Sequence, residues 1–201
     1  PCSSFDNFYP TNIILENFIK NEKVNNDNLL AVSPDNGAIK RTNFYANMLG
    51  CELGGHFEKQ RDVYRVVDGK NPILKHEYIG KDVKGKDIII VDDMIASGES
   101  MIDVARELKK RGAQKIYLMS AYSLFTKGLE VFDEAYGEGL FTKLYTTNLS
   151  YVSDEALSRP WICQADCSEY VAKIIWTFYQ GKSVAPILAY KSPLLEDFAR
   201  K

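Results

Sequence analysis

The chain has 201 residues, of which 45% are hydrophobic and 26% are charged, and its formal net charge is −2. This is the composition of an ordinary globular protein with one sizeable core. It offers no broad basic surface for nucleic acid, and no apolar run approaches the length of a membrane span. We therefore expect small molecules or further copies of the same chain as partners, and no membrane.

The cysteines point to a reducing compartment. They lack paired CxxC spacing, and with only two histidines in the chain they do not compose a zinc site. We interpret them as reduced thiols of a cytoplasmic protein. They are Cys2, Cys51, Cys163 and Cys167.

The first part of the chain predicts an entry segment followed by a strand, loop and helix unit. Residues 1–28 combine a short amphipathic helix with a closing polar run. An apolar strand is expected at 29–32 and a helix at 38–49, with Gly50 as its C-terminal cap.

The loop between this strand and helix has the features of an anion site. Tight loops present backbone N–H groups at a helix start, and Lys40 and Arg41 add positive charge in the first turn. Asp35 is suited to hold a divalent ion directly or through water. The alternative is a plain turn, since Pro, Asp, Asn and Gly are the default turn residues. The candidate diphosphate residues are Ser33, Asp35, Asn36, Gly37, Lys40 and Arg41.

The next stretch predicts a flap. A strand is expected at 51–58, and the charged run 59–62 follows it; such a run usually marks a solvated surface loop. Asp68-Gly69 is a turn signal between two extended stretches of 63–80. The sequence therefore predicts a hairpin-like flap, which can close over a neighbouring phosphate site.

The central stretch predicts a buried strand, a short loop and a helix. Four β-branched residues at 88–91 form the strand, and apolar residues recur at helical spacing from 101 to 108. Between them, two adjacent carboxylates can reach neighbouring sugar hydroxyls, while small residues wrap a phosphate at the helix N-terminus. The alternative is that the aspartates only end a strand and the small residues only cap a helix. The candidate ribose 5-phosphate residues are Asp92, Asp93, Ala96, Ser97, Gly98, Glu99 and Ser100.

The remaining elements complete an α/β domain. Strands are expected at 115–121 and 141–146, a helix at 125–136, and a late amphipathic helix at 168–180. The order predicts a doubly wound, mainly parallel sheet with helices on both faces. We expect one domain over 29–180 and a C-terminal tail at 181–201.

Three of these segments resemble a known family. Asp-Asp-x-x-x-Ser-Gly-x-Ser at 92–100 resembles the ribose-phosphate loop of the type I phosphoribosyltransferase fold. Residues 33–41 are similar to the diphosphate loop of ribose-phosphate diphosphokinases, the phosphoribosyl diphosphate synthetases. Lys59 and Arg61 are similar to the catalytic lysine and arginine of that family, and all three segments fall in family order. The resemblance runs from about Phe5 to Asn148 and is greatest to a longer bacterial branch of the synthetases.

The resemblance implies a reaction and its participants. Enzymes of this family transfer the β,γ-diphosphoryl group of ATP to the anomeric hydroxyl of ribose 5-phosphate, which gives phosphoribosyl diphosphate and AMP. Lys59 and Arg61 are then the expected cations at the transferred group, and Arg61 is also expected at the ribose 5-phosphate site. Asp35 is the expected ligand of Mg²⁺. We also expect a homo-oligomer.

The chain departs from the synthetase pattern in two ways, and two alternative functions stay open. Many synthetases carry an acidic residue where this chain has Ala96, and their N-terminal half, which supplies adenine contacts, has no counterpart here. The chain therefore looks like a C-terminal domain that is inactive by itself. A nucleobase-salvage phosphoribosyltransferase would use the same loop but needs a hood over the base, for which a flap can serve. A non-catalytic, synthetase-associated regulatory relative is disfavoured by Lys59 and Arg61.

Overall fold

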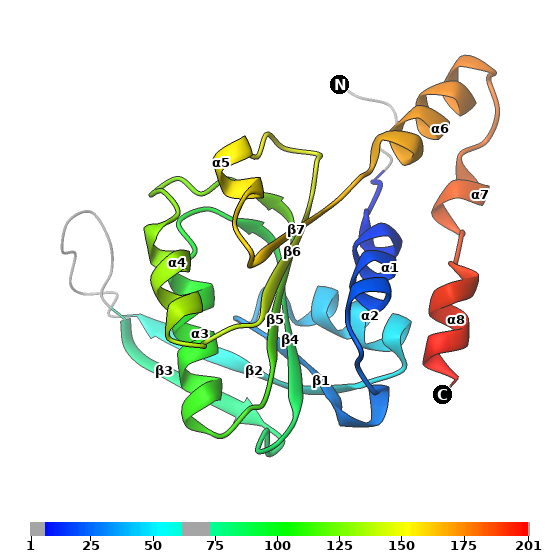
Figure 1. The fold of residues 1–201 in the computed structure, drawn as a ribbon. Helices are drawn as coiled ribbons and strands as arrows, with labels where there is room; N and C mark the ends of the chain where they lie inside the picture. Colours follow the sequence, from blue (N-terminus) through cyan, green and yellow to red (C-terminus); the bar gives the residue numbers. More distant parts are fainter. Residues whose placement is uncertain (1–6, 62–72, 201) are drawn as a thin grey trace.

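The computed structural model describes residues 7–61 and 73–200, with side chains left undescribed at 59–61 and 73–76. Figure 1 shows its helices and strands. In chain order they are α1 Thr11–Asn21, the 3₁₀ turn η1 Asn26–Asn28, β1 Leu29–Ser33, α2 Ile39–Leu49, β2 Glu52–Arg61, β3 Ile73–Gly80, β4 Asp87–Ile95, α3 Glu99–Lys110, β5 Ile116–Ser123, α4 Glu130–Gly137, β6 Lys143–Thr147, α5 Asp154–Leu157, β7 Ile162–Ala165, α6 Ser168–Tyr179, α7 Ala185–Leu188 and α8 Pro193–Ala199.

One seven-stranded sheet organises the molecule, in the order β3-β2-β1-β4-β5-β6-β7. All neighbouring strands are parallel except β2 and β3, which form an antiparallel hairpin at one edge. The predicted α/β class is confirmed. A hairpin is present, but its first strand is β2, which ends at Arg61, whereas the hairpin was predicted within 63–80; the expected turn at Asp68-Gly69 lies outside the described residues. From β1 the chain continues to β2, toward one edge of the sheet, and from β4 it continues to β5, toward the other edge. The carboxyl ends of β1 and β4 therefore form a topological switch point, where open α/β sheets bind ligands.

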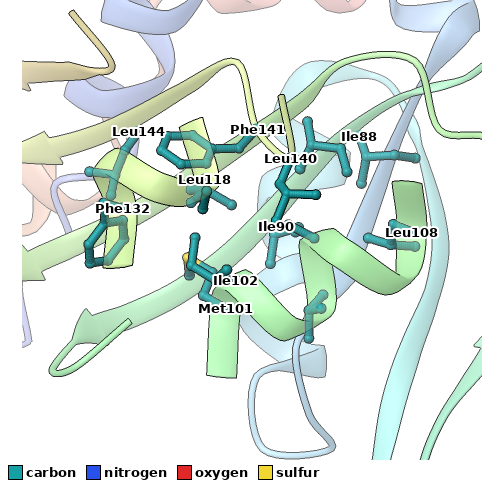
Figure 2. Close-up of a cluster of buried hydrophobic side chains, with 14 of the residues drawn as sticks. Ile88, Ile90, Met101, Ile102, Leu108, Leu118, Phe132, Leu140, Phe141 and Leu144 are labelled. Atoms are coloured by element: carbon teal, nitrogen blue, oxygen red, sulfur yellow. The ribbon is translucent and has the colours of Figure 1, made fainter. Parts of the chain in front are cut away.

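The central strand is buried on both faces, as its β-branched run predicts. Ile88 and Ile90 belong to the core cluster on the side of α3 and α4, together with Leu118 of β5 and Leu144 of β6 (Figure 2). Ile89 and Val91 belong to the core on the other face. Each completely buried aliphatic side chain contributes about 1.5–3 kcal/mol to folding. The strand is thus a rigid support for the loop that follows it.

Helices α1, α2 and α8 cover the second face of the sheet (Figure 1). Leu195 of α8 is buried in the same core as Ile14 and Leu15 of α1. Gly50, which has φ +65° at the predicted C-terminal cap of α2, lets α8 approach, because a Cβ at Gly50 would lie 2.6 Å from the carbonyl oxygen of Ala199. Residues before 29 and after 180 therefore share this core, while the domain boundaries themselves stay a prediction.

Glu22, directly after α1, links the end of this helix to the sheet by hydrogen bonds. Its carboxylate accepts hydrogen bonds from the hydroxyls of Tyr117 at 3.1 Å and Tyr145 at 2.8 Å, and Phe18 packs edge-on against both rings. Burial, together with the Glu22 carboxylate, raises the pKa of both tyrosines, so both remain protonated donors.

We expect Glu22→Ala to lower the free energy of unfolding by about 2 kcal/mol, because two tyrosine hydroxyls in buried surroundings lose their acceptor. Glu22→Gln should lose less, since the amide oxygen still accepts one bond. Urea unfolding measures the difference. The matched control is Glu16→Ala on the same helix, which removes only a pair with the exposed Lys20 and should change stability by about 0.5 kcal/mol or less. Equal losses for Glu16→Ala and Glu22→Ala would contradict the assigned role of Glu22.

One predicted helix begins five residues later than expected. The stretch 125–129 forms turns, and α4 starts only at Glu130. Phe125 has φ +47° and Gly128 has φ +85°, values that interrupt a right-handed helix. The helical prediction for 125–129 was therefore wrong.

The late part of the chain differs from the prediction in two further ways. The sequence analysis did not predict helix α5 or strand β7, and β7 extends the sheet beyond β6. Helix α6 forms at the predicted place, but it has no buried residue, and it lies apart from the sheet in Figure 1. Its exposed apolar side chains include Ile175, Trp176 and Phe178.

The described residues contain no helix that is both long and apolar enough to cross a membrane. Cys51, Cys163 and Cys167 are free thiols, and burial raises the pKa of each. That the cysteines are reduced stays a prediction, and Cys2 lies outside the described residues.

Candidate functional site

A cleft of about 230 Å³ lies at the switch point of the sheet. The loop after β1 and the loop after β4 both contribute to it, so the two predicted phosphate sites share one cavity. A larger cleft of about 610 Å³ lies among α1, α6 and α7, but no predicted site residue lines it. The smaller cleft is lined by Pro34, Asp35, Asp92, Met94, Ile95, Ala96, Ser97, Gly98, Ser100 and Met101.

The loop after β4 requires glycine at position 98. Gly98 has φ +82° and immediately precedes α3, whose first N–H groups have no partner within the helix. A Cβ at Gly98 would lie 2.1 Å from Cζ of Phe132, which is completely buried. The loop thus rests directly on the core and holds backbone donors at a helix N-terminus, the arrangement that binds phosphate.

The acidic pair lies within the strand and not after it, since β4 continues to Ile95. Arg41 bridges the pair: its guanidinium lies 3.0 Å from Asp92 Oδ1 and 2.9 Å from Asp93 Oδ2. This contact joins α2 to β4 across 51 positions of sequence, and the sequence analysis did not predict it.

Burial raises the pKa of Asp92 to about 6, and the neighbouring Asp93 side chain adds to the rise. The Asp93 N–H and the Arg41 guanidinium oppose it. The Asp92 carboxylate is therefore mostly ionised at neutral pH, where it can accept hydrogen bonds from sugar hydroxyls.

The loop after β1 is ordered by its own polar groups. Ser33 Oγ donates to the Asp35 carbonyl oxygen at 2.7 Å, and Asp35 Oδ1 accepts from the Ala38 N–H at 3.0 Å. Of the predicted diphosphate residues, Asp35 lines the cleft and Arg41 reaches the acidic pair, whereas Asn36, Gly37 and Lys40 are exposed beside it.

Asp35 and Asp92 bring hard oxygen donors to the same cleft. Mg²⁺ in phosphate-transfer sites takes one or two carboxylates and completes its shell with water and substrate phosphates. The donor set therefore fits magnesium held together with a substrate. Among the described residues, no group of three or more His, Cys, Asp or Glu side chains forms a cage that would hold a metal alone.

Lys59 and Arg61 lie on the part of β2 that extends beyond the site edge of the sheet. His56 pairs with Ser33, the last residue of the parallel strand β1, and β2 continues from there to Arg61. At 3.3 Å per residue, the backbone of Arg61 stands about 16 Å beyond that edge. The surface loop that was the alternative interpretation of the charged run is thus excluded for 59–61, which belong to a strand of the hairpin, and their backbone continues past the carboxyl end of β1, the end of the sheet that carries the cleft.

The sequence analysis also missed the loop between β5 and α4. The Leu124 N–H donates to the Ile95 carbonyl at 2.8 Å, and the Thr126 N–H donates to the Ala96 carbonyl at 2.9 Å. This loop, residues 124–129, which we call the bracing loop, therefore holds the end of β4 and the first residue of the phosphate loop. No signal in the sequence could have found it, because the bonds use backbone atoms only.

Comparison with known proteins gives a consistent picture. A family model described as "Phosphoribosyl transferase domain" matches residues 12–134. A ribose-phosphate pyrophosphokinase of Thermococcus kodakarensis is 36% identical over 73% of this chain and 49% of its own length. Another from Ralstonia nicotianae is 29% identical over 92% of this chain and 54% of its own length.

A solved structure has a similar fold. The crystal structure of phosphoribosylpyrophosphate synthetase from Mycobacterium smegmatis superposes with a TM-score of 0.63 at 20% identity, over 84% of this chain and 51% of the other. The chain spans about half the length of the curated relatives it matches.

Proposed function

We propose that this chain, which belongs to the phosphoribosyl transferase domain family, is the ribose 5-phosphate- and diphosphate-binding half of a ribose-phosphate diphosphokinase. The whole protein would transfer diphosphate from ATP to ribose 5-phosphate and release phosphoribosyl diphosphate and AMP. The two relatives described above carry the name of this activity.

One observation carries the proposal: Asp92, a phosphate loop and the Asp35 loop meet in one cleft at the switch point, and Arg41 joins Asp92 to Asp93, which does not line the cleft. Asp92 would accept hydrogen bonds from the ribose hydroxyls, and Asp93 would support it through Arg41. The backbone from Ala96 to Ser100 would hold the 5-phosphate. Residues 33–37, with Lys40, would hold the diphosphate of the second substrate.

Phosphoryl transfer depends on alignment and charge neutralisation more than on covalent help. Mg²⁺, which we propose as the cofactor held by Asp35, would neutralise charge on the transferred group. Lys59 and Arg61 would supply the two protein cations, Lys59 as a compact point charge and Arg61 as a planar fork that also reaches the sugar phosphate. The extension of β2 beyond the carboxyl end of β1 supports this role for the hairpin.

A salvage phosphoribosyltransferase is the competing function, and two assays separate them. We expect calorimetry to detect binding of ribose 5-phosphate to the chain but no binding of free nucleobases. We also expect AMP release from ATP, magnesium and ribose 5-phosphate by the whole protein. Base-dependent release of pyrophosphate from phosphoribosyl diphosphate would contradict the proposal. Equal affinity of the chain for ribose and for ribose 5-phosphate would also contradict it.

We also propose a cytoplasmic homo-oligomer. The reduced cysteines support the location. The apolar side chains exposed on α6, with Trp176 60% and Tyr179 79% exposed, support a contact with another protein surface.

A further inference from the structure

The proposed phosphate loop carries a negative charge of its own. Glu99 is the first residue of α3, and one of its carboxylate oxygens lies 3.3 Å from Ser97 Oγ, a proposed phosphate donor. A phosphate bound at this helix start would therefore meet a carboxylate beside it. Residues 95–101 contain no lysine or arginine, and Arg41 is already paired with Asp92 and Asp93.

A lysine from the bracing loop lies next to this carboxylate. Lys127 Nζ is 2.9 Å from Glu99 Oε1, while Ser97 approaches the other carboxylate oxygen. Glu99 thus connects the lysine to the proposed phosphate donor through a single carboxylate. Both members of the pair are about half exposed, so the contact contributes little to folding stability.

The backbone of the bracing loop is strained in a way that presents Lys127. Phe125 adopts φ +47°, which costs a non-glycine residue about 1–3 kcal/mol. Its ring is held by Phe132 at a centroid distance of 5.2 Å and by Trp161 at 6.0 Å. The turn then closes with the Gly128 N–H donating to the Phe125 carbonyl, which sets Lys127 at its tip. The core therefore fixes the conformation from which Lys127 reaches Glu99.

We propose that Lys127 is a positioning residue for sugar-phosphate binding: it neutralises Glu99 at the start of α3 and so allows a phosphate dianion to occupy the loop. This inference rests on the proposed function. Lys127 acts through Glu99, and neither residue takes part in the transfer step.

The size of the effect follows from electrostatics. Repulsion between a carboxylate and a phosphate dianion about 5 Å apart in a water-like medium corresponds to roughly tenfold in affinity. We therefore expect Lys127→Ala to weaken ribose 5-phosphate binding by roughly tenfold, and Lys127→Arg to restore most of it. In the E99Q background the ion pair that holds Lys127 near the loop is gone, so the exposed lysine moves into solvent, where its charge is screened. Lys127→Ala should then change affinity by less than about twofold.

Isothermal titration calorimetry of ribose 5-phosphate at fixed ionic strength tests this, with thermal melting of each variant recorded alongside. The matched control is Lys173→Ala, which breaks a similarly exposed lysine–glutamate pair on α6 and should leave binding unchanged. A Lys127→Ala variant that binds like the unmodified chain would overturn the inference and leave the proposed function standing. A loss of the same size in the E99Q background would also overturn it, because Lys127 would then act on the phosphate directly. An unmodified chain that does not bind ribose 5-phosphate would overturn both.

Discussion

Replacing Lys59 by alanine is expected to lower the rate of AMP formation by the whole protein by a hundredfold to a thousandfold, while ribose 5-phosphate affinity changes little. The reason is the assignment of this cation to the transferred group: a contact made mainly in the transition state affects turnover and not ground-state binding. The backbone of β2 carries Lys59 past the carboxyl end of β1, the end of the sheet that carries the cleft.

The measurement is steady-state AMP release with saturating ATP and magnesium, paired with calorimetry of ribose 5-phosphate. Lys81→Ala is the matched control, because Lys81 follows the other end of the same hairpin, where it pairs with Glu52 at 2.7 Å. Equal losses of turnover and affinity for Lys59→Ala would reassign Lys59 to substrate binding and contradict its catalytic role.

Replacing Gly98 by alanine is expected to weaken ribose 5-phosphate binding by about a hundredfold and to lower the free energy of unfolding by about 3 kcal/mol. The left-handed backbone and the overlap with Phe132 each oppose a Cβ, and together they force the loop off the core. Loss of two charge-assisted hydrogen bonds to the phosphate accounts for the change in affinity.

Gly139→Ala is the control for backbone strain alone. Gly139 also has a positive φ, +70°, but a Cβ there would meet nothing within 4 Å. It should cost about 1 kcal/mol of stability and leave binding intact. Phe132→Leu in the G98A background should recover part of the lost affinity by relieving the overlap. Normal binding by Gly98→Ala would show that the loop does not hold the phosphate.

The elements that the sequence predicted correctly are those with strong local signals. The β-branched run of β4, the helical spacing of α3 and the glycine after α2 act over a few residues, and the structure confirms each of them. The two phosphate loops were predictable for the same reason, because small and turn-forming residues directly follow apolar strands.

What the sequence could not predict depends on contacts between distant segments. The Arg41 bridge to the acidic pair requires α2 and β4 to be neighbours, which only the strand order decides. The late start of α4 depends on Phe125, whose unfavourable φ is compensated by the packing of its ring against Phe132 and Trp161. The spacing of apolar residues along a helix gives no information about the Arg41 bridge or the packing of the Phe125 ring. The contact of Lys127 with Glu99 also joins distant segments, so the sequence analysis did not predict it.

The central claim is that the loop after β4 holds the phosphate of a pentose phosphate, and a crystal of the chain soaked with ribose 5-phosphate tests it most directly. We predict the 5-phosphate between Ser97 and Ser100, with the ribose hydroxyls at Asp92. A soaked crystal in which ribose 5-phosphate occupies the larger cleft among α1, α6 and α7, while the loop after β4 stays empty, would contradict the claim.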